Sequence, residues 1–176
     1  MVSMNLFAEN DYRFFGPSRI NQSVRCRTAE VRPNGEIGPR GLMVRDPFAT
    51  QLLNGEKVWE IRGRPTQIRG PVVIVKSGTG HAYGTANLVR VLGPLEVEDL
   101  IDAKELPESE RAEIITVGLP YAKTYAYVFS DPKWFEKPLP YNHPSGAVTW
   151  VRLSDLNLET VHYASAPHKF TQPRLV

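Results

Sequence analysis

Short apolar runs rich in β-branched residues recur along the chain, and they limit it to folds built mainly from short strands. Residues 70–78, GPVVIVKSG, form an almost continuous run of this kind, which is typical of a buried central strand. A second run at residues 82–94, AYGTANLVRVLGP, is closed by a glycine and a proline. Shorter strand-like segments lie at residues 42–44, 57–64, 123–135 and 147–153. About five or six short strands with few helices predict a small, mostly antiparallel α+β barrel.

Two segments have helical rather than strand character. Before residues 48–53, Asp46 is a suitable N-cap and Pro47 suits the first helical position, while Asn54-Gly55 supplies a left-handed stop. Residues 96–115 are acidic with helical spacing, which predicts one or two surface helices broken at Pro107. The first helix is short, so packing must hold it in place.

Size and charge permit one domain and say little about the partner. The chain has 176 residues, 41% of them hydrophobic, which is enough for a genuine core. The net charge of +2 is too small to establish a nucleic-acid partner. Residues 1–70 carry 11 Arg and Lys against 7 Asp and Glu, whereas residues 95–113 carry 2 against 8. This asymmetry either orients the protein toward an anion or reflects scattered surface charge.

Several classes of protein are excluded by simple sequence features. The single Cys26 rules out a disulfide within the chain, and no Cys/His spacing of a zinc site occurs, so we predict neither a metal nor another cofactor. The first residues lack the pattern of a signal peptide, and no run approaches the roughly 18 apolar residues of a membrane span. We therefore expect a soluble cytoplasmic protein without a membrane partner.

A densely charged stretch, LLNGEKVWEIRGRP at residues 52–65, follows the first predicted helix. In a strand that starts at Lys57, the residues Glu60, Arg62 and Arg64 share one face, and the intervening Trp59 and Ile61 point into the core. Glu60 and Arg62 then either pair with each other or contact a ligand together. The spacing alone favours an ordinary solvated strand.

The same stretch contains the complete pattern G-x-K-x-x-E-x-R, at Gly55, Lys57, Glu60 and Arg62. It resembles the hallmark of the ASCH family (activating-signal-cointegrator homology), and residues 125–153 resemble that family's closing segment, which ends in a strand with a tryptophan. The resemblance covers about residues 41–153 and is closest to the longer ASCH proteins, including the endothelium-and-lymphocyte-associated branch. It leaves residues 1–40 as an irregular N-terminal arm and residues 154–176 as a tail on the surface.

The resemblance implies a PUA-like β-barrel that binds RNA or a nucleoside-like ligand in a cleft around the motif. Lys57, Arg62 and Arg64 would supply cations for phosphate, and Glu60 would accept from an exocyclic amine. Ser77, in the strand-joining loop at residues 76–84, and Tyr127 are expected at the edge of the cleft. A structural clasp of Glu60 with Lys57 or Arg62 is the open alternative.

Catalysis is the second hypothesis. Some ASCH proteins are amidohydrolases that act on N4-acetylcytidine, and others are ribonucleases. The amidohydrolase pattern is the motif lysine, a threonine three residues on and a glutamate on a later strand. Here Lys57 matches, but Glu60 replaces the threonine and Asn87 aligns with the glutamate. If the chain is an enzyme, Lys57 and Glu60 are its predicted catalytic residues. A third hypothesis is an interaction module that holds a protein partner through the N-terminal arm.

Overall fold

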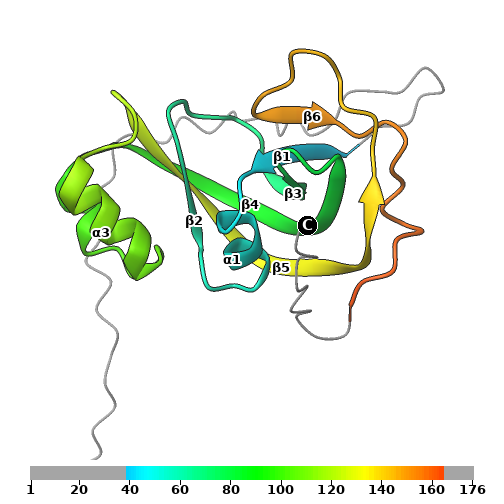
Figure 1. Ribbon diagram of the computed structural model, residues 1–176, viewed down its shortest axis with the longest axis horizontal. Coiled ribbons are helices and arrows are strands. Elements are labelled where there is room, and N and C mark those ends of the chain that lie inside the picture. The colour runs from blue at the N-terminus through cyan, green and yellow to red at the C-terminus, as the bar shows by residue number, and fades with distance from the viewer. Residues whose placement is uncertain (1–38, 165–176) are drawn as a thin grey trace, which may run out of the picture.

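The computed structural model describes residues 39–164, in which six strands and three helices form (Figure 1). In chain order they are β1 (Arg40–Val44), α1 (Phe48–Leu53), β2 (Trp59–Arg62), β3 (Gly70–Lys76), β4 (His81–Leu95), α2 (Val97–Ile101), α3 (Glu108–Val117), β5 (Thr124–Pro140) and β6 (Trp150–Arg152). Within this part of the chain, no helix is both long and apolar enough to span a membrane.

All six strands join one sheet in the order β2-β5-β4-β3-β1-β6. Only β1 and β3 are parallel, so the predicted mixed, mostly antiparallel α+β fold is confirmed. The prediction of a closed barrel is wrong for the described residues, because the sheet begins at β2 and ends at β6 without these two strands pairing. Repeated register shifts between β4 and β5 disrupt their ladder locally, which bends and twists the two long strands without closing the sheet (Figure 1).

The apolar side chains form three clusters on this sheet. The first lies under α1 and includes Leu52, Ile74 and Leu88, and the second lies near β6 around Val151. A third cluster seats α2 and α3 against β2 and the neighbouring β5, with Leu100, Leu106, Ile114, Ile61 and Ala126 as members. Strand β2 therefore runs between α1 and the α2–α3 pair, which places its side chains between two packed units.

Helix α1 packs closely against the sheet at Gly84. A Cβ at Gly84 would lie 2.2 Å from the carbonyl oxygen of Lys133 and 2.7 Å from Cδ2 of Leu53, so only glycine allows this approach. The helix ends as predicted, with Gly55 in the left-handed region at φ 75°. Its predicted start is corrected: the helix begins at Phe48 after Pro47, and Asp46 does not cap its backbone. The Asp46 carboxylate instead accepts a hydrogen bond from the Thr50 side chain.

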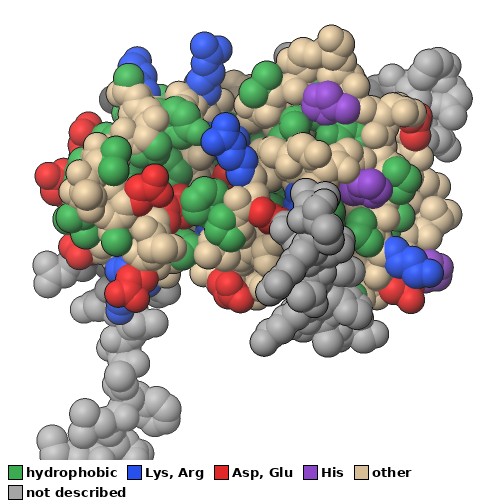
Figure 2. Space-filling model, in the orientation of Figure 1, with side chains coloured by type: hydrophobic (Ala, Val, Ile, Leu, Met, Phe, Trp, Pro, Cys, Tyr) green, Lys and Arg blue, Asp and Glu red, His purple; other side chains and the backbone are tan. Residues whose placement is uncertain are grey.

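The acidic segment forms α2 and α3, separated at Pro107 as predicted. Helix α2 opens with a capping box, in which the Asp99 carboxylate accepts from the backbone N–H of Glu96 at 2.9 Å. Acidic side chains gather over this end of the molecule, at the left of Figure 2. Residues 1–38 of the predicted arm (residues 1–40) and the tail beyond residue 164 lie outside the described residues, and Arg40, which the prediction placed in the arm, begins β1. The described part of the tail pairs with β5 through Tyr163 and Phe135.

Candidate nucleic-acid interface

The motif side chains form one buried chain of ion pairs. The ammonium of Lys57 lies 2.5 Å from a carboxylate oxygen of Glu110 and 3.2 Å from Oε2 of Glu60. The other oxygen of Glu60 lies 2.8 Å from the guanidinium of Arg62, which also donates to the carbonyl of Met43 at 2.6 Å. Lys57 is 2% exposed and Glu60 is 5% exposed. We call this series of ion pairs, formed by Lys57, Glu60, Arg62 and Glu110, the clasp. It connects α3, the loop after α1, β2 and β1.

This arrangement matches the clasp that the sequence left open. Two carboxylates balance two cations, and the Lys57 ammonium also lies 4.2 Å from the centroid of the Phe48 ring. Within residues 39–164, two buried polar atoms of the clasp lack a hydrogen bond: Oε2 of Glu60, whose contact with the ammonium is only an ion pair, and Nε of Arg62. The motif therefore keeps an acceptor and a donor with unused hydrogen-bonding capacity, despite its burial.

Sequence reasoning missed Glu110, which lies 53 residues beyond Lys57 on a helix expected at the surface. One signal was available: Glu110 stands four residues before the buried Ile114, so both lie on the inner face of α3. The carboxylate that pairs with Lys57 thus comes from helix α3, whereas the amidohydrolase pattern has its glutamate on a later strand. Asn87, which aligned with the amidohydrolase glutamate, instead donates to Asp131 at the surface, at 3.3 Å.

Burial raises the pKa of Glu110 above its ordinary value of 4.5, and the nearby Lys57 offsets only part of that effect. A carboxyl group that holds its proton more tightly in the folded state adds stability that is complete below pH 4.5 and is lost as the pH rises through the folded-state pKa. We therefore expect the free energy of unfolding of the wild type, relative to Glu110→Gln, to fall as the pH rises above 4.5.

Urea denaturation of both proteins across about pH 4 to 7 measures this difference. Glu108→Gln, a change at an exposed position of the same helix, controls for removal of one acidic charge. A constant difference between wild type and Glu110→Gln over that pH range would contradict the assignment.

An open pocket of about 430 Å³ lies beside the clasp, between the β2–β3 loop, β5 and β6. Its lining combines aromatic rings, arginines, and side-chain amide and hydroxyl groups: Arg40, Arg64, Pro65, Thr66, Gln67, Ile68, Tyr127, Thr149 and Trp150.

Hydrogen bonds hold the pocket walls in place. The Tyr127 hydroxyl donates to the carbonyl of Arg64 at 2.8 Å, and the Arg69 guanidinium donates to the carbonyls of Thr66 and Ile68. The ring of Tyr127 stacks on that of Trp150, with centroids 6.1 Å apart and planes 20° apart. Burial raises the pKa of Tyr127, which keeps its hydroxyl protonated and able to donate. The pocket is therefore largely preformed.

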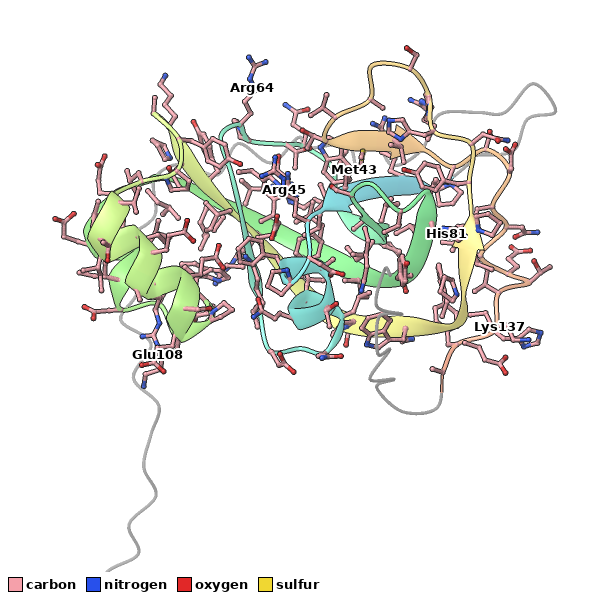
Figure 3. The ribbon with its side chains drawn as sticks, in the orientation of Figure 1. Met43, Arg45, Arg64, His81, Glu108 and Lys137 are labelled. Atoms are coloured by element: carbon pink, nitrogen blue, oxygen red, sulfur yellow. The ribbon has the colours of Figure 1, made fainter. Side chains whose placement is uncertain are left out.

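The predicted site residues divide between the clasp and the pocket. Lys57, Glu60 and Arg62 converge in the clasp, whereas Arg64 and Tyr127 line the pocket. The two groups adjoin, because Tyr127 is the cross-strand partner of Glu60. The side chain of Arg64 extends outward from the end of β2 (Figure 3).

Two further residues complete the comparison with the predicted site. Ser77 lies in the β3–β4 turn, where its N–H donates to the carbonyl of Val44, and it is not among the pocket's lining residues. Trp150, the tryptophan of the closing segment, lines the pocket although it was not among the predicted site residues.

The chain is similar to known proteins over most of the described residues. The ASCH domain model matches residues 42–139, more than half of the chain. The crystal structure of an ASCH protein from Zymomonas mobilis is similar to this one, with a TM-score of 0.50 and 18% sequence identity, over 69% of this chain and 90% of that chain. A single-substitution variant of that protein gives a TM-score of 0.49 at 19% identity, over 66% of this chain and 90% of its own.

At this level of identity, the likeness to the Zymomonas mobilis protein shows the fold alone. No curated protein matches the chain. The assignment to a family rests on the match to the ASCH domain model, which spans the motif, the clasp and most of the sheet. The chain belongs to the ASCH domain family.

Proposed function

We propose that this ASCH domain binds single-stranded RNA or a nucleoside-like ligand in the pocket beside the clasp. The PUA-like fold of the family is often linked to RNA binding, which supports this class of ligand. One observation carries the proposal: a preformed, open pocket combines the stacked Tyr127 and Trp150 with the outward-pointing Arg64. The finer assignment to the longer ASCH proteins is also a proposal and rests on the sequence resemblance.

Aromatic rings beside cations are what unpaired nucleotides require. Bases that are not paired stack on aromatic side chains, while arginine and lysine hold the phosphates. Trp150 is only partly buried, and Tyr127 supports its ring from within the fold. The volume of about 430 Å³ falls within the roughly 300–1,000 Å³ of small-molecule sites. A nucleobase therefore suits the pocket in both size and chemistry.

Polar groups around the pocket can read the edge of such a base. Gln67 carries both donors and an acceptor, and Thr66 and Thr149 carry hydroxyls. Glu60 and Arg62 are not among the lining residues, and we propose that they support the pocket wall through the clasp, because Tyr127 is the cross-strand partner of Glu60. Lys57 has a mainly structural role in this proposal, because its ammonium is already engaged by two carboxylates.

Charge distribution orients the ligand. The acidic α2–α3 end would repel phosphate, whereas Arg64 projects from a different edge (Figures 2 and 3). We propose binding ahead of hydrolysis because Lys57 is 2% exposed, so its ammonium does not meet a substrate from solution.

Arg64→Ala tests the proposal with little risk to folding, because the side chain is exposed. We expect weaker binding of a fluorescent single-stranded RNA. The slope of log affinity against log salt should decrease by about 0.7 for each phosphate that the variant no longer neutralises. Lys137→Ala, at another exposed position, is the matched control and should change neither quantity.

Removal of the stacking surface by Trp150→Ala should weaken binding by about 5- to 150-fold, since stacking on an aromatic ring is worth about 1–3 kcal/mol per base. Circular dichroism checks that this variant is folded. Wild-type affinity and salt dependence in both Arg64→Ala and Trp150→Ala would refute the proposed site.

A further inference from the structure

We infer that Tyr121 forms a second base-stacking position beside the pocket, so that the ligand is an oligonucleotide spanning at least two nucleotides. This inference rests on the proposed function and extends it. Tyr121 lies in the connection from α3 to β5 and is 42% exposed, which makes it one of the few large apolar side chains open to solvent in the described residues.

Tyr121 contacts Gly63, the residue before the pocket-lining Arg64. A Cβ at Gly63 would lie 2.8 Å from Cδ1 and 3.0 Å from Cγ of Tyr121, so the ring rests against the backbone of that glycine. The next residue is Arg64, which lines the pocket. The Tyr121 ring and the pocket therefore contact consecutive residues of the β2–β3 connection, Gly63 and Arg64.

A hydrogen bond holds the backbone of Tyr121 in place. The Thr124 hydroxyl donates to the carbonyl of Tyr121 at 3.0 Å, and Thr124 is fully buried at the start of β5. Gly63 supports one side of the ring while the remainder stays exposed. A ring held in this way loses little conformational freedom when a base stacks on it.

The charges around Tyr121 favour a phosphate backbone. Arg64 and Lys123 are both exposed, and neither forms an ion pair within residues 39–164. Residues 114–123, which lead from the end of α3 past Tyr121, contain no Asp or Glu. In the view of Figure 2, Lys and Arg side chains project from the upper edge of the molecule, whereas acidic side chains gather at its left. Tyr121 thus combines an exposed ring with neighbouring cations, the two features by which sites for single-stranded nucleic acid bind bases and phosphates.

These positions suggest a specific path. One base occupies the pocket on Trp150, the phosphate that follows or precedes it meets Arg64, and the neighbouring base stacks on Tyr121. A mononucleotide would use only the pocket. An oligonucleotide would use both rings and should bind more tightly than a mononucleotide.

Titration of the full chain with cytidine monophosphate and with an eight-nucleotide oligocytidine tests this path. We expect Tyr121→Ala to lose about 5- to 150-fold in affinity for the oligonucleotide, the range that stacking of one base supplies. Its affinity for the mononucleotide should stay unchanged. Tyr121→Phe, which keeps the ring, should behave as the wild type.

Tyr163→Ala is a matched control, because Tyr163 is 39% exposed and contacts Phe135 on another part of β5. It should leave both affinities unchanged. If Tyr121→Ala binds the oligonucleotide as the wild type does while Arg64→Ala binds it weakly, the second stacking position is wrong and the pocket stands. If the wild type binds neither ligand, the pocket proposal fails and this inference fails with it.

Discussion

Replacement of Lys57 by methionine is expected to lower the free energy of unfolding by about 3–5 kcal/mol, as removal of one partner from a buried ion pair does. The substitution keeps an unbranched side chain of similar shape but leaves the Glu60 and Glu110 carboxylates buried without their shared ammonium. The loss should be large because Lys57 is 2% exposed, so water cannot replace the missing charge.

Urea denaturation and the thermal midpoint measure this loss, which corresponds to a decrease on the order of 10 °C for a domain of this size. Lys137→Met is the matched control at an exposed position and should shift the midpoint very little. A double-mutant cycle with Glu110→Gln isolates the pairwise energy. A loss below about 1 kcal/mol, typical of a surface pair, would contradict the buried clasp.

The same variant separates the two roles that the motif lysine was given. At a temperature where both proteins are folded, a purely structural Lys57 predicts wild-type RNA affinity for Lys57→Met. A direct phosphate contact predicts weaker binding and a shallower salt dependence. Arg64→Ala, measured alongside, shows how removal of a phosphate-binding cation changes affinity in this protein.

Gly84→Ala is expected to destabilise the fold by about 3 kcal/mol, at the upper end of what overpacking of a core costs. The added methyl would lie 2.2 Å from the carbonyl oxygen of Lys133, which is backbone on the paired strand β5 and cannot move aside as a side chain can. It would also press on Leu53 at the end of α1. Because α1 leads into the motif, the change should disturb the clasp as well as the sheet.

Gly63→Ala provides the comparison for this prediction. Its nearest atoms belong to the side chain of Tyr121, which is partly exposed, so a small displacement of the ring relieves the contact. Its cost in unfolding free energy should therefore be clearly smaller than that of Gly84→Ala. Equal losses in the two variants, measured by urea denaturation, would show that the close approach at Gly84 has no special importance.

Local chemistry explains why much of the fold could be predicted from the sequence. The β-branched run predicted the central strand β3, Asn54-Gly55 predicted the end of α1, and Pro107 predicted the break between α2 and α3. Each of these features depends on residues next to one another in the chain. The closed barrel was wrong because closure depends on whether the two end strands meet, which alternation within a strand does not reveal.

The site was harder to predict because its contacts join distant segments. Alternation along β2 predicted one core face and one polar face, yet Glu60 and Ile61 are both buried, since α3 and α1 pack on either side of this strand. The partner of Lys57 is 53 residues away, and the stack of Tyr127 on Trp150 depends on how β5 and β6 approach in space. Arg64 and Tyr127 were predicted to bind ligand, and they do line the pocket.

An open sheet has a consequence for how the protein behaves at high concentration. Within residues 39–164, its two outermost strands have backbone N–H and C=O groups that a second molecule could extend, but they are only four and three residues long. The backbone N–H groups at the start of the longer one already face the carbonyl of Glu105. Strands this short offer few hydrogen bonds to a neighbour, which discourages edge-to-edge aggregation.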